Sequence, residues 1–282
     1  MTDSTEWRRI WDVRAKESVS DFDLDRGFAR REEEIERLSD QELIEFIQPK
    51  VTDTVLDAGC GTGVNIVRLN SRVKKIIGID YTAGSIERCQ KRIREQTIAN
   101  AEVIIGSISA VPLANCSVDK ILCLSVLQYL EDSEVRQVLR EFARLLAPEG
   151  VIILHVKNQS SLYWSTLLAA KKLKKLLGRR TSVYKVRPFE WYIKELNWAG
   201  FDVVDFNGFN LLTLDFMPRV LLSFLQKSEL RHCRDWFFQS PMVRRHGADL
   251  KIKAKIGINR AEIETRRAEK DSGICENIEH LV

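Results

Sequence analysis

Two acidic residues and three glycines, placed at the ends of two apolar runs, form the arrangement with the clearest chemistry in this chain. Asp57 ends the run VTDTVLD, and Gly59, Gly61 and Gly63 follow it. Asp80 ends a second run, KKIIGID, 17 residues after Gly63. Glycines let the backbone turn sharply and pass close to a ligand. Asp57 can accept a hydrogen bond from a ligand ammonium, and an acid in the place of Asp80 can bind ribose hydroxyls. The pattern favours a ligand that contains a nucleoside and carries positive charge.

Two kinds of cofactor could use such a glycine turn. A dinucleotide fingerprint G-x-G-x-x-G would need a glycine where Val64 stands, and pyrophosphate has no use for an acid before the first glycine. S-adenosylmethionine carries an ammonium and a sulfonium and has no phosphate, so it suits this turn better. A helix beginning at Val64 would direct its N-terminal amides at the ligand. A third interpretation is a glycine turn that only packs a helix on a strand.

The elements that must position these residues alternate between strand and helix, as in a parallel sheet covered on both faces. Ser39 and Glu42 have the spacing of a capping box for a helix near 39–48, which leads into the first strand. Pro188 and Gly200 mark the start and stop of a late helix. We expect helices over 39–48, 64 onward, 85–95, 135–146 and 188–199, and strands over 51–57, 101–105, 120–124, 150–156, 201–209 and 248–256, besides the run that ends at Asp80.

Several further stretches strengthen the interpretation through a family resemblance. DAGCGTG followed by GIDYT resembles the first two motifs of the class I S-adenosylmethionine-dependent methyltransferases. The similarity continues through GSISAVPLANCSVDKILCLSVLQYLED and VLREFARLLAPEGVIILHVKN to about Asn158. IWDVRAKE resembles the entry segment of the small-molecule branch, whose helix covers the cofactor. The resemblance extends over a little more than half of the chain.

The resemblance implies a doubly wound, mostly parallel, seven-stranded Rossmann-like α/β sheet with helical insertions, and S-adenosyl-L-methionine as cofactor. It implies that Tyr81 packs on the adenine. Ser107 and Ile108 stand where the family often has an acid and a small apolar residue, and Ser107 can still meet the adenine amino group. The cofactor-binding residues it implies are Asp57, Gly59, Cys60, Gly61, Gly63, Asp80, Tyr81, Ser107, Ile108 and Leu124.

The chemistry of methyl transfer asks for few catalytic groups. In-line displacement gains most from holding the acceptor atom close to the methyl group, and a base is needed only for a weakly acidic acceptor. Many small-molecule members carry a histidine after the fourth strand, where this chain has Gln128 and Tyr129. Tyr129 and His155 are the catalytic candidates, although a tyrosine there is as often a packing residue and a lone strand histidine is more often a core residue. His232 and His246 are weaker candidates, and no histidine has metal-ligand spacing to another, so no metal is expected.

Composition indicates a soluble globular protein. The 282 residues are 44% apolar and 30% charged, with a net charge of +4. The charged N-terminus lacks a signal-peptide core and no apolar run could span a bilayer, which predicts a cytoplasmic protein. The six cysteines contain no C-x-x-C pair, so the sequence predicts neither a zinc site nor a disulfide scaffold. Cys60 and Cys123 are expected to be small buried packing residues.

The expected layout is a helical cap over 1–50, a methyltransferase domain over 51–258 and a frayed tail over 259–282. Insertions at 159–187 and 211–247 should lie near the acceptor pocket, because ligands of open α/β sheets bind beyond the carboxyl ends of the strands. Residues 158–187 contain eight bases and no acid. Within them, 162–180 has leucines on one side and lysines on the other. This basic amphipathic helix is a lid over the pocket, a peripheral membrane contact or, least favoured, a nucleic-acid contact.

The sequence therefore predicts a methyltransferase acting on a small or lipid-like acceptor. The resemblance favours oxygen over nitrogen or carbon as the methylated atom. The alternatives are a protein or nucleic-acid methyltransferase, and an inactive cofactor-binding fold that serves as a partner subunit. The missing histidine after the fourth strand favours the inactive fold slightly, whereas Asp57, the glycines and Asp80 argue against it.

Overall fold

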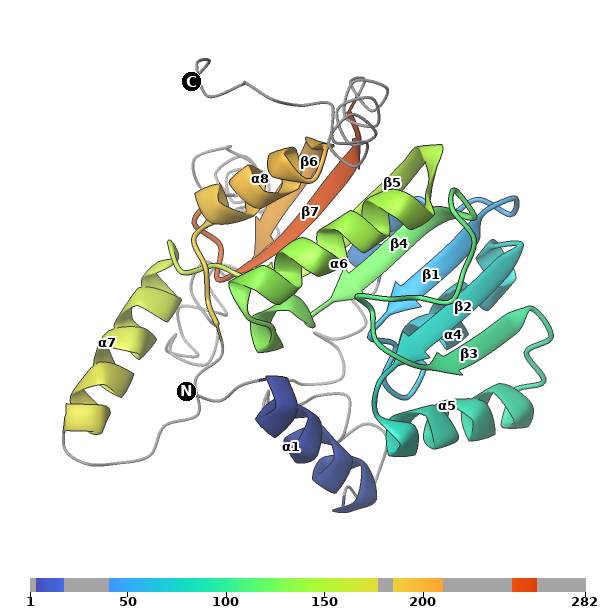
Figure 1. Cartoon of the computed structure of the whole chain (residues 1–282), viewed down its shortest axis with the longest axis horizontal. Coiled ribbons are helices and arrows are strands. Elements are labelled where there is room, and N and C mark those ends of the chain that lie inside the picture. Colours follow the sequence, from blue (N-terminus) through green and yellow to red (C-terminus); the bar gives the residue numbers. More distant parts are fainter. Residues whose placement is uncertain (1–3, 18–40, 177–184, 210–244, 258–282) are drawn as a thin grey trace, which may run out of the picture.

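A seven-stranded sheet forms the centre of the protein (Figure 1). The computed structural model describes residues 4–17, 41–176, 185–209 and 245–257. The strand order is β3-β2-β1-β4-β5-β7-β6. The strands are β1 (Thr54–Ala58), β2 (Lys75–Asp80), β3 (Ala101–Ile105), β4 (Val118–Leu124), β5 (Leu146–Lys157), β6 (Phe201–Phe209) and β7 (Asp249–Ile256). The first five are parallel, and β7 runs antiparallel to both β5 and β6. The α/β fold is as predicted, but the sheet is mixed.

Helices cover both faces of this sheet. They are α1 (Ser4–Glu17), a short α-helix over 41–47, α4 (Val64–Leu69), α5 (Ala83–Glu95), α6 (Asp132–Leu145), α7 (Leu162–Leu176) and α8 (Phe189–Trp198), with 3-10 turns η1 (Asn70–Arg72) and η2 (Leu127–Tyr129). α6 and α8 lie on one face, where Phe142 and Tyr192 are buried in the larger core cluster. Ile47 and Ile66 belong to the second cluster, on the other face. The result is a three-layer arrangement.

The helix α6 shows how side-chain spacing sets an element. Val135, Val138, Leu139 and Phe142 are buried and recur at helical spacing, so one stripe of the helix faces the sheet. The helix was predicted to begin at Val135 but begins at Asp132. The reason is a capping box in which Glu131 accepts from the third helical amide and the Glu134 side chain accepts from the amide of Glu131.

The start of β5 also differs from the prediction. The strand was expected from Gly150 and begins at Leu146, directly after α6. While β4 advances from Val118 to Lys120, its partner advances from Leu146 to Val151, so the strand bulges around Pro148. Proline cannot donate to the ladder and is tolerated at bulges. The bulge brings Leu146 into the core, with no exposed area.

Other predicted segments fall partly outside the described residues. Outside the described residues lie 18–40 of the expected N-terminal cap, which include Ser39, and 211–244 of the second insertion, which include His232. The expected tail over 259–282 also lies outside them. The first insertion contains α7, which covers 162–176 of the predicted basic helix. Within the described ranges, no helix combines the length and the apolarity that crossing a membrane requires.

Candidate cofactor and acceptor site

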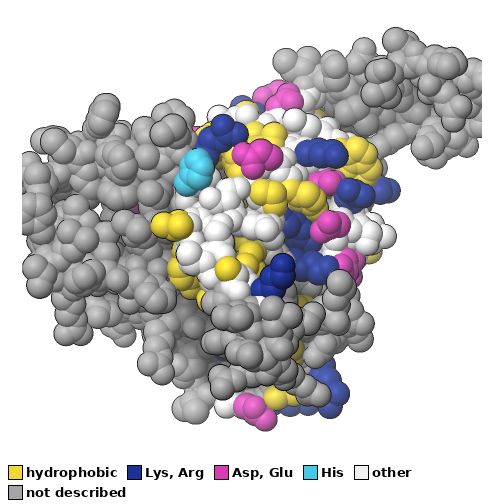
Figure 2. Space-filling model, turned by 90° about the vertical axis from the view of Figure 1, so that its left-hand side faces the viewer, with side chains coloured by type: hydrophobic (Ala, Val, Ile, Leu, Met, Phe, Trp, Pro, Cys, Tyr) yellow, Lys and Arg dark blue, Asp and Glu magenta, His cyan; other side chains and the backbone are white. Residues whose placement is uncertain are grey.

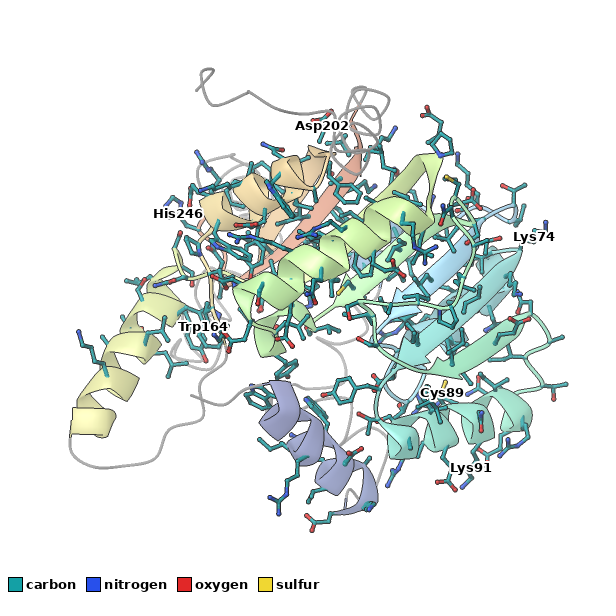
Figure 3. The ribbon with its side chains drawn as sticks, in the orientation of Figure 1. Lys74, Cys89, Lys91, Trp164, Asp202 and His246 are labelled. Carbon is teal, nitrogen blue, oxygen red and sulfur yellow. The ribbon has the colours of Figure 1, made fainter. Side chains whose placement is uncertain are left out.

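The glycine loop connects β1 to α4 at the carboxyl end of the sheet. Gly59, Gly61 and Gly63 all have positive φ, at 84°, 52° and 85°. The amides of Gly59 and Cys60 both donate to the carbonyl of Ile79, at 2.8 and 3.1 Å, and so tie the loop to β2. A Cβ on Gly59 would lie 2.3 Å from Val126 Cγ2, and one on Gly63 would lie 2.5 Å from Cys89 Sγ. The loop is therefore closely packed between β4 and α5, whose Cys89 is labelled in Figure 3.

Asp80 lies at the tip of β2, beside this loop. Its Oδ2 accepts from the Gly61 amide at 3.1 Å, and its Oδ1 accepts from the Thr82 amide at 2.8 Å. Burial raises the pKa of the Asp80 carboxyl above its ordinary value, although these hydrogen bonds lower it; the Asp12 carboxylate of α1 raises it further. A carboxylate has about four acceptor positions. Each oxygen of Asp80 thus has capacity for a further donor, as two neighbouring ribose hydroxyls require.

Asp57 is the second acid of the site and has only 1% of its surface exposed. It occupies β1, in register with Gly78 of β2 and Leu122 of β4. Asn65 Nδ2, in the first turn of α4, lies 3.4 Å from Asp57 Oδ1. The two predicted acids therefore end neighbouring parallel strands and flank one glycine turn.

The helix α1 lies at the end of the sheet toward which β1 to β4 point (Figure 1). It packs on α5, where a Cβ on Gly84 would lie 2.9 Å from Ala15 Cβ. Trp7 and Trp11 contact the Tyr129 ring edge-on, with centroids 4.8 and 5.6 Å apart. Burial raises the pKa of the Tyr129 hydroxyl, with opposing effects from Gln128 and Arg14. At neutral pH Tyr129 is thus a protonated phenol set in an aromatic cluster, which suits packing or hydrogen-bond donation better than work as a base.

The turn that carries Tyr129 is fixed by a buried arginine. Arg187, 5% exposed, donates to the carbonyls of Leu127 and Leu130 at 2.9 and 2.6 Å and pairs with Asp132. Lys185 pairs with Glu131 in the same region. Arg187 is therefore a buried structural residue, although the sequence groups it with the bases of the first insertion.

His155 lies in β5, in register with Leu124 of β4 and Lys251 of β7. Its Nδ1 is 2.9 Å from Ser125 Oγ, and its Nε2 is 3.6 Å from Asp249 Oδ1. Asp249 is buried and pairs with Lys157 at 2.5 Å. Burial opposes ionisation of Asp249, but Lys157 and His155 more than offset it and lower the pKa of that carboxyl. The histidine thus lies between a serine hydroxyl on one side and a buried carboxylate on the other, rather than isolated among apolar residues.

The remaining predicted cofactor residues surround the same end of the sheet. Tyr81 is half-buried after β2, and Leu124 is half-buried at the end of β4. Ile108 is buried in the larger core cluster, and Ser107 is exposed with its Oγ 2.8 Å from Ser109 Oγ. Cys60 is buried as predicted; its contact with Cys89, then burial, raise the pKa of its thiol. The thiol is accordingly a packing group.

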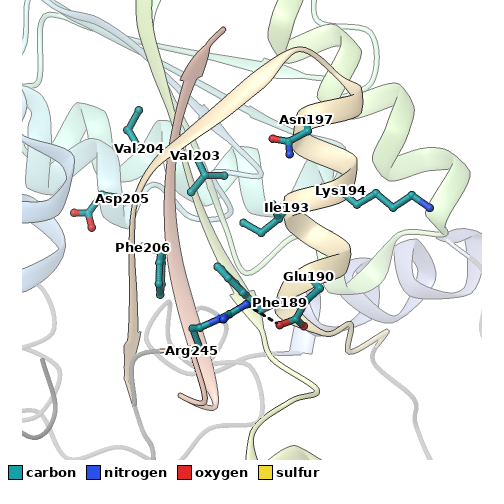
Figure 4. A pocket seen from close by; sticks show the side chains of 10 residues that line it. All are labelled: Phe189, Glu190, Ile193, Lys194, Asn197, Val203, Val204, Asp205, Phe206 and Arg245. Atoms are coloured by element: carbon teal, nitrogen blue, oxygen red, sulfur yellow. Dashed lines mark hydrogen bonds and ion pairs between the residues drawn. The ribbon is translucent and has the colours of Figure 1, made fainter. Parts of the chain in front are cut away.

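A groove of about 690 Å³ lies elsewhere, between α8 and β6 (Figure 4). Ile193, Val203 and Phe206 form its apolar wall, and Glu190 pairs with Arg245 at its end. β6 is the edge strand, separated from β1 by β4, β5 and β7. The groove is thus remote from the glycine loop. Among the described residues, no group of three or more acids, histidines and cysteines could hold a metal ion.

Comparison with known proteins identifies the domain that carries this loop. Residues 55–150 match the family model described as a methyltransferase domain. This stretch, about a third of the chain, is similar to the class I S-adenosylmethionine-dependent methyltransferases. The domain includes the whole glycine loop, Asp80 and Tyr129, whereas His155 and Asp249 lie beyond it.

Relatives of this methyltransferase domain have different names. The malonyl-[acyl-carrier protein] O-methyltransferase of Yersinia pestis is 31% identical over 45% of this chain and 45% of its own length. A probable S-adenosylmethionine-dependent methyltransferase of Mycolicibacterium smegmatis is 27% identical over 57% and 58%. The chain spans about half the length of these relatives. The solved structure of the [4+2]-cyclase SpnF shares the fold, with a TM-score of 0.62, 16% identity and coverage of 91% and 97%.

Sequence reasoning missed several residues around this candidate site. Ser125 follows β4 with a φ of 61°, a value that a β-strand pattern does not reveal. Asp249 meets His155 only because β7 pairs with β5. The alternation in DLKIKAKI was the available signal, because it puts Asp249 on one sheet face with Lys251 and Lys253.

Proposed function

We propose that the protein transfers the methyl group of S-adenosylmethionine to a small or lipid-like acceptor, at oxygen. The observation that carries the proposal is the pair of acids, Asp57 and Asp80, on neighbouring strands around one glycine turn. With the cofactor bound, its sulfonium supplies the methyl group. The residues of this chain bind it, orient it and exclude water.

The charge of the site supports this cofactor over a dinucleotide. Asp57 is almost fully buried, and a buried carboxylate beside a pyrophosphate would add repulsion to its desolvation cost. A ligand ammonium reverses the sign of that interaction. Asn65 and the turn around Gly61 complete the polar surroundings of the methionine portion.

The topology supports a location for the acceptor. β1 has β2 on one side and β4 on the other, so the strand order switches direction there, and ligands of open sheets bind at such a point. The ribose belongs over β2, at Asp80. The acceptor therefore belongs on the opposite side, over the ends of β4 and β5. Tyr129, Trp7 and Trp11 lie near this region and offer apolar, aromatic surface.

Two observations support the acceptor class. The Yersinia pestis relative is named an O-methyltransferase, which favours oxygen. The helix α7 begins close after β5, at Leu162, and suits a lid over an apolar acceptor. Figure 2 views the molecule from the side of α7 and α8 and shows basic side chains mixed with acidic ones. Acids of α8 pair with two of the bases near them, Glu195 with Arg136 and Glu190 with Arg245.

Calorimetric titration with S-adenosylmethionine and S-adenosylhomocysteine tests the cofactor assignment. We expect micromolar binding, weakened at least tenfold in Asp80→Ala, which corresponds to about 1.4 kcal/mol. Asp202→Ala is the matched control, because Asp202 is exposed on β6 at the far edge of the sheet. Equal loss in both variants, or no binding by the unaltered protein, contradicts the proposal.

The acceptor class is tested separately. Release of S-adenosylhomocysteine is measured with small hydroxyl compounds, fatty acids, total RNA and a mixture of unmethylated proteins. Turnover only with RNA or protein contradicts a small-molecule acceptor. Cofactor binding without turnover on any of them supports the inactive partner-subunit alternative.

A further inference from the structure

Ser125 occupies an unfavourable backbone conformation at a functionally important point. Its φ of 61° is in the left-handed region, where glycine is the least costly residue and serine is uncommon. Such strain persists where the surrounding structure or the function maintains it. The Ser125 amide donates to the His155 carbonyl at 2.9 Å, and the side chains of the two residues meet at the same distance. The serine is thus fixed to β5 through both its backbone and its hydroxyl.

Ser125 lies directly before a residue that packs on the glycine loop. The next residue, Val126, packs on Gly59, where an added Cβ would lie 2.3 Å from Val126 Cγ2. Ser125 itself directly follows β4, the strand beside β1. It is half-buried, so a polar group lies where the acceptor is expected to approach the methyl group.

Behind Ser125 the polar side chains continue as a line. His155 Nδ1 faces the serine hydroxyl, and His155 Nε2 is 3.6 Å from the buried Asp249 carboxylate. Lys157 on β5 pairs with Asp249, and Lys251 on β7 is in register with His155 and 3.7 Å from Glu42. Asp249 is the acid placed to favour a protonated imidazole, while the two lysines keep the net charge around it near neutral.

We propose that Ser125, His155 and Asp249 form a proton relay that removes the proton from an acceptor hydroxyl during methyl transfer. The inference rests on the proposed function and makes it more specific. The acceptor gives its proton to Ser125 Oγ as the serine gives its own to His155 Nδ1. The acceptor oxygen bonds to the methyl carbon while the carbon–sulfur bond breaks, and the sulfonium becomes a neutral thioether. Asp249 stabilises the imidazolium until its proton returns to water.

The relay specifies the acceptor class as a phenol or alcohol, whose hydroxyl is largely protonated at neutral pH. A carboxylic acid is already ionised there and needs no base. Ser125 is the catalytic residue, because it meets the acceptor. His155 and Asp249 act through it.

The test measures methyl transfer from labelled S-adenosylmethionine to phenol, 1-octanol and octanoic acid between pH 5.5 and 9. Ser125→Gly removes the hydroxyl while suiting the left-handed backbone, and His155→Gln removes the base. We expect each to lower the rate with phenol or octanol about 100-fold or more, within the usual range for acid–base catalysis. We expect them to leave cofactor affinity within twofold and any transfer to octanoate unchanged. Ser117→Ala is the matched control, since Ser117 is exposed and directly precedes β4, at the end of the strand opposite to Ser125.

The pH profile separates catalysis from a structural role. The methyl-transfer rate of the unaltered protein should fall toward low pH, because protonated His155 cannot accept a proton. In His155→Gln the rate should not show this fall. Three results would each overturn the relay. They are an unchanged methyl-transfer rate in Ser125→Gly, the same pH profile for His155→Gln and the unaltered protein, and cofactor binding with no transfer to phenol or octanol. Failure of the unaltered protein to bind the cofactor would instead remove the proposed function on which the relay depends.

Discussion

Replacing Gly59 by alanine tests the packing of the glycine loop against Val126, in the turn after β4. At a φ of 84°, a residue with a Cβ costs about 1–2 kcal/mol relative to glycine. The new Cβ would also lie 2.3 Å from Val126 Cγ2, far inside normal contact. Overpacking of this kind costs about 1–3 kcal/mol. We therefore expect Gly59→Ala to lower the free energy of unfolding by about 2–5 kcal/mol, which is a large part of the about 5–15 kcal/mol typical of a folded domain.

The two contributions can be separated with a second substitution. Val126→Ala removes the clashing methyl groups and by itself costs about 1 kcal/mol, because Val126 is only half-buried. In the double variant only the backbone strain remains, so the coupling between the two sites should recover about 1–3 kcal/mol.

Urea unfolding followed by circular dichroism measures all three variants. Gly106→Ala is the matched control, because its φ is not in the left-handed range and its new Cβ would lie 3.3 Å from the flexible end of Ile79. We expect its effect to stay within about 1 kcal/mol. Strict additivity of Gly59→Ala and Val126→Ala would show that the contact does not exist and refute the reasoning.

Three further predictions concern other parts of the molecule. Arg187→Met removes the side-chain donor of the Leu127 and Leu130 carbonyls and should lower the free energy of unfolding in urea by about 2–5 kcal/mol, with only partial rescue by Arg187→Lys. An unchanged urea midpoint would contradict the stabilising role of these two hydrogen bonds. The Arg136 hydrogen bonds lower the pKa of the Glu195 carboxyl in the folded protein. The ionised carboxylate therefore stabilises the fold above the unfolded-state pKa of about 4.3, and this stabilisation is lost as the pH falls through the pKa of the folded state. The stability difference between the unaltered protein and Glu195→Gln should therefore shrink from pH 7 to pH 3.5, and a constant difference would exclude this linkage. Iodoacetamide should label the exposed Cys116 well before the buried Cys60 and Cys123, as peptide mass spectrometry would show. The reagent reaches an exposed thiol more easily, and burial raises the pKa of the Cys123 thiol. Faster labelling of Cys60 would indicate that the glycine loop opens.

The sequence located most elements because their local signals agree. β3 and β6 have the predicted bounds, and β7 begins one residue later than expected. Each is a short run rich in β-branched or aromatic residues, or alternates at period two, between turn signals. Pro188 and Gly200 bracket α8 as expected, since proline suits a helix start and glycine a helix stop. The glycine loop and both acids were found because their spacing is local.

What the sequence missed depends on pairing between distant segments. Ser125 and His155 meet through the parallel register of β4 and β5, and Asp249 joins them through the antiparallel pairing of β7. Arg187 looks like one base among eight in a basic segment, yet the turn after β4 buries it. Its partners are backbone carbonyls, which carry no residue-specific signal. Periodicity within one segment cannot report such contacts.

The place of β7 in the sheet also determines the order in which the protein can assemble. Among the described strands β7 is the last along the chain, yet it lies between β5 and β6. Until residues 249–256 leave the ribosome, those two strands have no partner on their facing edges. β1 to β5 can pair as they are made, because their order in the chain keeps most neighbours close. Insertion of β7 is then a late, non-local step, of the kind that slows folding and prolongs the exposure of aggregation-prone edges.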